Sequence, residues 1–211
     1  NIKMINIKEA NIKTKRILKI FIESTVKIIK EEGIEEVTIR KVADIAGYNS
    51  ATIYNYFENC NQLISFAAMK FISNYVQALP DYFDKERNTL ENFLEIWKCF
   101  CKYCFKSPQI YYAVFTENIG DKSEDLIKNY YSLFPEDLGN PPKEVMPMLM
   151  ESNFVERCRI SIDPCIKEGY FAEKEAEEIN EMIRLTYQGM LSLIVNNRVD
   201  YSSQEATERT M

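Results

Sequence analysis

The chain has 211 residues, of which 46% are hydrophobic and 27% charged, a composition typical of a globular protein with a proper core. It contains no histidine, which excludes Ser-His-Asp and Cys-His catalysis and histidine-ligated zinc. No apolar run approaches the ~20 residues that span a bilayer, and residues 1–11 lack the apolar core of a signal peptide, so we expect a cytoplasmic protein. The six glycines form no phosphate-binding motif, and we do not expect an enzyme.

The charge is unevenly placed along the chain, with a basic start and an acidic remainder. Residues 1–30 hold eight Lys and Arg against only Glu9 and Glu23, which is a net charge of +6. Since the whole chain carries −6, residues 31–211 carry −12. A basic end on an acidic body is expected where one end of a protein meets the phosphates of nucleic acid.

The apolar periodicity predicts helices throughout the chain and no strands. A long amphipathic helix is expected over about residues 14–32, ended by Gly33, and another over about 61–79, ended by Pro80. Residues 90–104 and a segment around 111–115 also have helical spacing, whereas residues 134–142 are expected to form a loop. The last helices are expected over about 143–168, where Pro164 can cause a bend, and about 174–197, followed by a frayed tail from residue 200.

Residues 38–57 have the pattern of two short helices joined by a tight turn. Thr38 is a good N-cap for the first helix, and apolar residues then recur at helical spacing up to Gly47, which can take positive φ where the helix ends. Asn49 is a second N-cap and opens a helix whose buried side would include Tyr54. This is a helix-turn-helix, a motif whose second helix enters the major groove of DNA.

The second helix of this motif carries short polar side chains at its exposed positions and its N-terminal end. Asn can form paired hydrogen bonds with adenine, Ser and Thr serve several base edges, and Ala or a Thr methyl can contact a thymine methyl. Each of these residues alone can simply face solvent, but as a set at this spacing they favour DNA contact. The predicted DNA-contacting residues are Tyr48, Asn49, Ser50, Ala51, Thr52 and Asn55.

The same stretch resembles the N-terminal DNA-binding signature of the TetR family of bacterial regulators. The residues that carry the resemblance are Thr38, Ile45, Ala46, Gly47, Asn49, Thr52, Tyr54, Phe57 and Leu63, and the match extends upstream to Phe21. By this resemblance, Thr38 and Tyr56 contact phosphates, and Tyr54 packs in the core. Where the family usually places a Lys that meets a phosphate, this chain has Cys60.

The resemblance also implies how the chain is divided. It implies an all-α fold with a helix-turn-helix DNA-binding domain at residues 1–60 and an effector-binding and dimerisation domain at residues 61–211. The effector pocket of such proteins lies among the middle helices, where this chain is rich in aromatic residues that could otherwise be plain core. The candidate pocket residues are Trp97, Phe100, Tyr103, Tyr111 and Phe115.

The last predicted helix has two neighbouring apolar stripes, more than the chain's own core requires. The first stripe contains Ile179, Ile183, Tyr187, Met190 and Ile194, and the second contains Met182, Thr186, Gly189 and Leu193. In TetR-like proteins the last two major helices pair with their copies in a four-helix interface. We therefore predict a homodimer with Ile183, Tyr187, Met190 and Ile194 in its interface.

The six cysteines raise a second interpretation, a thiol-based redox or metal sensor. Cys101 and Cys104 share a helix face, but Cys99 lies ~200° away from Cys101, and Cys158 and Cys165 are ~10 Å apart along a continuous helix. Neither set can converge on one ion. Buried free cysteines are ordinary core residues in a reducing compartment, so we predict core packing with no metal and no cofactor.

Together these observations predict a ligand-responsive transcriptional regulator, a repressor that binds a palindromic operator as a homodimer. Its expected partners are double-stranded DNA, a small apolar or aromatic effector and a second copy of itself, with no membrane. The alternatives are the thiol-based sensor on the same fold and a DNA-binding partner protein that takes no small-molecule ligand.

Overall fold

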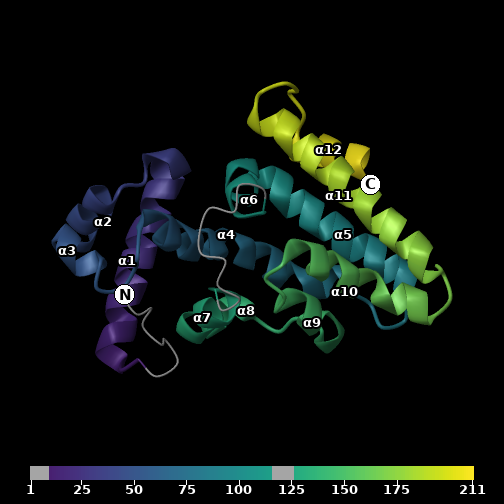
Figure 1. The fold of residues 1–211 in the computed structure, drawn as a ribbon, viewed down its shortest axis with the longest axis horizontal. Coiled ribbons are helices and arrows are strands. Elements are labelled where there is room, and N and C mark those ends of the chain that lie inside the picture. Colours follow the sequence, from purple (N-terminus) through teal and green to yellow (C-terminus); the bar gives the residue numbers. More distant parts are fainter. Residues whose placement is uncertain (1–9, 116–125) are drawn as a thin grey trace.

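The computed structural model of the chain describes residues 10–115 and 126–211. In these residues it is all-helical, as the sequence predicts, and it contains no strand (Figure 1). None of the described helices has both the length and the apolar character that crossing a membrane requires. The elements in chain order are α1 (Ile12–Glu31), η1 (Ile34–Glu36), α2 (Ile39–Ala46), α3 (Ser50–Ile53), α4 (Cys60–Tyr82), α5 (Thr89–Lys106), α6 (Pro108–Phe115), α7 (Leu126–Leu133), α8 (Pro135–Leu138), η2 (Lys143–Val145), α9 (Met146–Leu149), α10 (Phe154–Lys167), α11 (Glu173–Val195) and α12 (Ser203–Thr210).

The first elements, α1, η1, α2 and α3, form a unit at one end of the molecule that we call the head (Figure 1). α1 begins after Asn11, whose side chain accepts a hydrogen bond from the backbone N–H of Thr14 at 2.9 Å. One face of α1 packs against α2 and α4 and buries Phe21 completely. Gly33 follows with φ 106°, a value that costs glycine no Cβ clash, so the predicted end of this helix is confirmed.

α4 connects the head to the rest of the chain, which we call the body. In its first half, Phe66 contacts Phe57 of the head, with ring centroids 5.8 Å apart. In its second half, Tyr75 contacts Phe100 of α5 at 5.5 Å. The head and the body therefore share one hydrophobic core along this helix.

The body is a bundle built on α5, which lies beside α4. α6, α10 and α12 pack against α5, and α11 packs against α6, α10 and α12. α10 and much of α11 form the end of the molecule that lies away from the head (Figure 1). The centre of this bundle is aromatic, because the ring of Phe100 meets rings from α4, α6, α10 and α11.

The predicted end of α4 at Pro80 is wrong, because the helix continues to Tyr82. The backbone N–H of Phe83 still bonds to the carbonyl of Leu79 at 3.1 Å. In addition, the Lys102 ammonium of α5 donates to the Tyr82 hydroxyl at 3.0 Å. Contact with α5 thus keeps the last turn helical although the proline removes one backbone donor.

The predicted helix over 143–168 is also wrong, since the chain breaks between α9 and α10. Asn153 begins a new helix there by accepting from the backbone N–H groups of Val155 and Glu156 at 2.9 and 3.2 Å. Pro164 lies inside α10 and does not end it. The expected loop at 134–142 contains α8, and α7 occurs where no element was predicted.

The tail, predicted to fray, instead forms α12 and packs against α5. Ser202 caps this helix by accepting from the backbone N–H of Glu205 at 3.1 Å. Ala206 and Thr207 are buried. The helix is polar in sequence, so only its docking on α5 distinguishes it from a disordered end.

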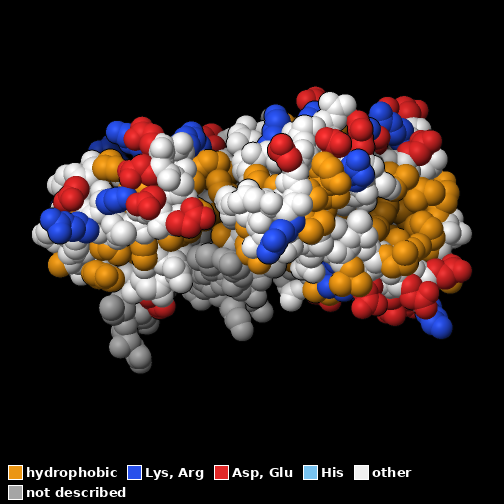
Figure 2. Space-filling model, turned by 90° about the horizontal axis from the view of Figure 1, so that it is seen from above, with side chains coloured by type: hydrophobic (Ala, Val, Ile, Leu, Met, Phe, Trp, Pro, Cys, Tyr) orange, Lys and Arg blue, Asp and Glu red, His pale blue; other side chains and the backbone are white. Residues whose placement is uncertain are grey.

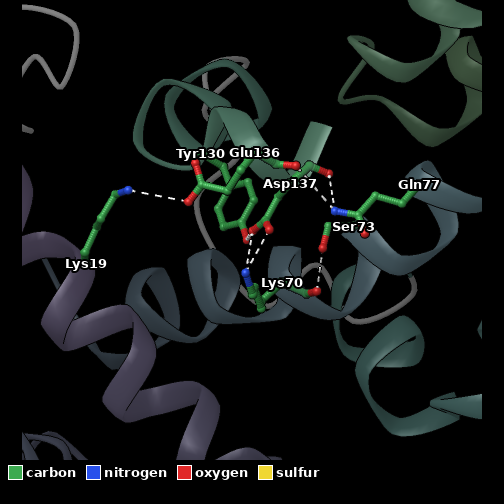
Figure 3. A network of polar contacts seen from close by, with 7 residues as sticks. All are labelled: Lys19, Lys70, Ser73, Gln77, Tyr130, Glu136 and Asp137. Carbon is green, nitrogen blue, oxygen red and sulfur yellow. Dashed lines mark hydrogen bonds and ion pairs between the residues drawn. The ribbon is translucent and has the colours of Figure 1, made fainter. Parts of the chain in front are cut away.

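A buried carboxylate joins α4 to the α7–α8 segment (Figure 3). Asp137 of α8 is only 4% exposed, and both its oxygens accept from the Lys70 ammonium, at 2.7 and 2.9 Å. The Tyr130 hydroxyl donates to the same carboxylate at 2.6 Å. Gln77 of α4 donates to the backbone carbonyl of Asp137 at 3.3 Å, so this segment is held to α4 by several polar contacts.

The α7–α8 segment also reaches the head. The Lys19 ammonium of α1 lies 3.5 Å from the Glu136 carboxylate and 4.8 Å from the centre of the Phe134 ring. Lys70 lies over the same ring at 5.6 Å. Unlike Asp137, Glu136 is largely exposed, so this second ion pair is screened by solvent.

We expect Lys70→Met to lower the free energy of unfolding by about 3 kcal/mol, because it leaves the buried Asp137 carboxylate without its cation. The matched change Lys19→Met removes an exposed pair and should cost less than about 1 kcal/mol. Urea unfolding of both variants at one protein concentration measures the difference. Equal losses of stability in the two variants would contradict the role given to Asp137.

Candidate nucleic-acid interface and body cavity

The helix-turn-helix in the head is held by caps that the sequence predicts. The Thr38 hydroxyl accepts from the backbone N–H of Lys41 at 3.2 Å and starts α2. Gly47 ends α2 in the left-handed region, with φ 73° and ψ 31°. Asn49 then starts α3 by accepting from the backbone N–H of Thr52 at 2.9 Å. The two caps and the turn thus determine where α2 begins and ends and where α3 begins.

The predicted DNA-contacting residues differ in how much of each side chain is exposed to solvent. Thr38, Tyr48, Asn49, Ala51 and Asn55 are exposed, whereas Ser50, Thr52 and Tyr56 are half-buried. The Thr52 hydroxyl also donates to the Asn49 amide oxygen at 2.9 Å. That oxygen is therefore occupied by the cap, and the amide N–H groups of Asn49 remain for a base edge.

Three tyrosines of the motif have different environments. Tyr48 and Tyr56 both pack their rings against Phe21 of α1, at centroid distances of 5.2 and 5.8 Å. Their positions are thus fixed by the head's core. Tyr54 is 44% exposed, so the expectation that it packs in the core is wrong. Ile53 and Phe57 are the residues of this stretch that fill the core.

A basic side chain that no sequence motif singled out lies beside Thr38. Arg40 is exposed and forms no ion pair with any residue that the structure describes. Its neighbour Lys41 is instead neutralised by Glu32 and Glu36, at 2.8 and 2.7 Å. Hydrogen bonding to Lys41 lowers the pKa of the Glu36 carboxyl, as expected for such a pair. Arg40 is therefore the cation of α2 that is available to a phosphate.

Cys60, which stands where a phosphate-contacting Lys was expected, is the first residue of α4 and is half-buried. Its thiol lies 3.7 Å from the Val37 carbonyl oxygen and donates to it. The side chain is thus directed at the backbone before α2. It offers no positive charge to DNA.

The body contains a small cavity of about 20 Å³ between α4, α5, α9 and α10. Of the five predicted pocket residues, Trp97 and Phe100 line it. Sequence reasoning missed its other lining residues. Most of them come from α4, α9 and α10, which are far in the sequence from the predicted residues on α5 and α6. The missed residues are Tyr75, Ile96, Met148, Phe154, Arg157, Cys158 and Ser161.

The other predicted pocket residues lie behind or away from the cavity. Tyr111 and Phe115 contact the ring of Phe100 at 5.7 Å each, in a second layer. Tyr103 is half-buried on another side of α5, where Lys106 lies 5.6 Å from its ring, so its assignment to the pocket is corrected. The helical spacing placed these residues on α5 and α6 but could not say which of them reach the cavity.

The thiols of the body are buried and protonated. Burial raises the pKa of Cys99 to about 12 and of Cys158 to about 11, and it raises the pKa values of Cys101 and Cys104 as well. A thiol in this state is a poor nucleophile and a poor metal ligand. Among the described residues there is also no cluster of side chains suited to a metal ion. These observations favour the core packing that the sequence predicts.

The two stripes of α11 have different roles in this structure. Tyr187 of the first stripe is completely buried, and its ring lies 5.8 Å from Trp97 and 5.3 Å from Phe100. It belongs to the chain's own core, which corrects its assignment to a dimer interface. Ile183, Met190 and Ile194 are half-buried against that core.

The second stripe of α11 is the exposed one. Met182 of this stripe and Leu185 beside it are 67% and 63% exposed, Leu193 is also exposed, and Val155 is exposed on the neighbouring helix α10. Figure 2 shows hydrophobic side chains gathered over the end of the body that lies away from the head. Large apolar side chains at such exposure are typical of a surface that contacts another protein.

The head and the start of α4 are similar in sequence to a known protein family. Residues 21–65 match the model of the family described as bacterial regulatory proteins, tetR family. An uncharacterized HTH-type transcriptional regulator of Haemophilus influenzae is 28% identical over 87 residues, which are 41% of this chain and 46% of that protein. The chain thus spans less than half the length of this curated relative.

Solved structures resemble the whole fold. A protein of Syntrophomonas wolfei described as a TetR-family transcriptional regulator has a TM-score of 0.57 at 18% identity, over 93% of this chain and 91% of that one. The fatty acid degradation regulator FadR of Bacillus halodurans has a TM-score of 0.56 at 14% identity, over 92% of each chain. FadR of Thermus thermophilus, a transcriptional repressor solved in complex with lauroyl-CoA, has a TM-score of 0.55 at 11% identity, over 92% of this chain and 90% of that one. These similarities concern the fold, and the matched family is one of regulators, not enzymes.

We expect Arg40→Ala to weaken DNA binding about equally for all sequences and to reduce the slope of log K against log salt by about 0.9 for each phosphate that Arg40 neutralises. Anisotropy titrations of a labelled duplex at several salt concentrations measure both quantities. Lys98→Ala on α5, which removes the same charge from the body, is the control and should leave the slope unchanged. An unchanged slope in Arg40→Ala would remove this residue from the interface.

Proposed function

The chain belongs to the TetR family through the domain at residues 21–65, and on this premise we propose that it is a ligand-responsive repressor. In this proposal it binds a near-palindromic operator as a homodimer and releases it when a small effector enters the body. Residues 1–60 are the DNA-binding domain and residues 61–211 the effector and dimer domain. Such a protein acts in the cytoplasm, where bacterial DNA lies.

The observation that carries the proposal is the geometry of the capped helix pair. Asn49 starts α3 at an exposed corner of the head, and Ala51 and Asn55 are exposed along and just after the same short helix. Thr38 and Arg40 lie at the start of α2, where a hydroxyl and a guanidinium can meet phosphates. This combination fits a helix that reads base edges beside a helix that is anchored on the backbone.

The exposed side of α11 supports the proposed dimer. Two heads on one two-fold axis can occupy half-sites roughly 34–36 Å apart, one turn of the double helix, which a single head cannot do. The apolar surface that α11 and α10 share lies at the end of the body away from the head, so pairing there leaves both heads free (Figure 1, Figure 2). Pairing would also remove Met182 and Leu185 from water.

The effector part of the proposal rests on the cavity and on α4. Tyr75 of α4 lines the cavity, and Phe66 of the same helix packs in the head. A ligand that binds one position of α4 better than another therefore shifts the distribution of head positions. One neighbour with this fold was solved in complex with lauroyl-CoA, a ligand with an apolar acyl chain.

We expect purified protein to select one inverted-repeat sequence from a random pool of DNA, because two equivalent heads read two equivalent half-sites. Sequencing of the bound DNA after several rounds provides the measurement. Recovery of DNA with no common sequence would contradict the proposed operator binding, and it would favour a partner protein without sequence-specific readout.

We also expect the protein to have about twice its chain mass of 24.8 kDa in light scattering at micromolar concentration. Leu185→Glu should shift it toward the monomer, because a charge is placed in the centre of the apolar surface. Ile12→Glu is the matched control, since Ile12 is 73% exposed in the head and far from α11. A monomeric wild-type protein, or a dimer in Leu185→Glu, would contradict this interface.

A further inference from the structure

Two charged residues are buried among those that the structure describes, and only one of them is paired. Asp137 is bound by Lys70 and Tyr130. Arg157 of α10 is only 6% exposed, yet its guanidinium forms no ion pair with any described residue, and its hydrogen-bond partner is the neutral Tyr75 hydroxyl. Its side chain lines the body cavity. A buried guanidinium has a high desolvation cost unless an acceptor compensates its charge.

Two buried hydroxyls close to Arg157 also lack good acceptors. The Tyr75 hydroxyl has the Met148 sulfur as its partner at 4.0 Å, and a thioether is a weak acceptor. The Tyr111 hydroxyl has no partner among the described residues. Burial raises the pKa of both hydroxyls, and the positive charge of Arg157 counteracts this increase in each. Both hydroxyls thus stay protonated and can donate.

The walls around these donors are apolar and largely flat. Trp97 and Phe100 are stacked at 5.3 Å, and Phe154 lies 5.7 Å from Phe100 at an angle of 30°. The lining of the cavity therefore includes two strong donors, the Arg157 cation and the Tyr75 hydroxyl, together with aromatic rings, and the Tyr111 hydroxyl lies in the layer behind Phe100. A ligand that satisfies this lining must bring an anionic acceptor joined to an apolar part.

We propose that the body binds a small organic carboxylate, with the anion held by Arg157 and the Tyr75 hydroxyl, and the apolar part against Trp97, Phe100 and Phe154. This inference rests on the proposed function only in naming that ligand as the effector. A planar guanidinium binds a carboxylate through two parallel hydrogen bonds, which neither a neutral alcohol nor an amine offers.

The cavity is so small that binding of the carboxylate requires a movement of the surrounding helices. About 20 Å³ is room for roughly one water molecule, so a carboxylate with an apolar part does not fit the present arrangement. Phe154 is the first residue of α10 and follows the break that Asn153 caps. Displacement of this end of α10 opens the space, and the same wall includes Tyr75 of α4.

The single tryptophan of the chain makes the test direct, because Trp97 lies in the cavity wall. We would titrate the full chain with octanoate and octanol, and with phenylacetate and phenylethanol, and follow tryptophan fluorescence. At least one carboxylate should bind about tenfold or more tightly than its alcohol, since hydrogen bonds to a charged group are the stronger ones. The acyl and the aryl pair distinguish which apolar part is preferred.

Arg157→Met should remove the preference for the carboxylate and leave the affinity for the alcohol nearly unchanged. Arg159→Met on the same helix is the control, because Arg159 is exposed and paired with Glu156 at 2.8 Å. Without ligand, Arg157→Met should melt no lower than the wild type, since it removes a buried charge without an anionic partner. A structural arginine would instead lower the melting temperature when replaced.

Three results would overturn the inference: no fluorescence response to either carboxylate up to millimolar concentration, equal affinity for carboxylate and alcohol, or an unchanged preference in Arg157→Met. If Arg157→Met does not fold, the inference is also overturned, because Arg157 is then structural. These assays contain no DNA, so their outcome is separate from the selection of operator sequences. Carboxylate binding that leaves DNA affinity unchanged would support the site and contradict its role as the effector site.

Discussion

The arrangement of this protein depends on the burial of α4 on two sides at once. Its first half belongs to the core of the head, where Phe66 meets Phe57, and its second half belongs to the core of the body, where Tyr75 meets Phe100. A close-packed core resists small displacements of one helix relative to its neighbours. Any change in the body that moves the second half of α4 is therefore transmitted to the head, with no flexible linker to absorb it.

The α7–α8 segment strengthens this connection from outside the core. Asp137 anchors the segment to α4 through its ion pair with Lys70, and Lys19 of the head lies over Phe134 of the same segment. The two contacts differ in character, since the first is buried on the carboxylate side and the second is exposed to solvent. The strong contact holds the segment on α4, and the weak one lets α1 move relative to it at little cost.

The desolvation cost of a buried charge has different consequences at Asp137 and at Arg157. For Asp137 the cost is offset inside the chain, so the residue contributes to structure. For Arg157 no described carboxylate offsets it, and the cavity beside it is too small for a ligand with an apolar part. A charge without an anionic partner at the edge of a small cavity favours a state in which both an anion and more space are present, which is what an effector-dependent change of shape requires.

The sequence by itself determined the local features of this protein, namely α1 with its end near Gly33, the caps at Thr38 and Asn49, the left-handed turn at Gly47 and the all-α fold. Such features depend on neighbours a few residues apart, which periodicity and capping rules describe. Only the tertiary structure decided that Pro80 lies inside a helix, that the polar tail docks as α12, that Tyr187 is core and Met182 exposed, and that Arg157 lines the cavity. These outcomes depend on contacts between α4, α5, α10, α11 and α12, which are far apart in the chain, and no local pattern records which face of a helix such a neighbour will cover.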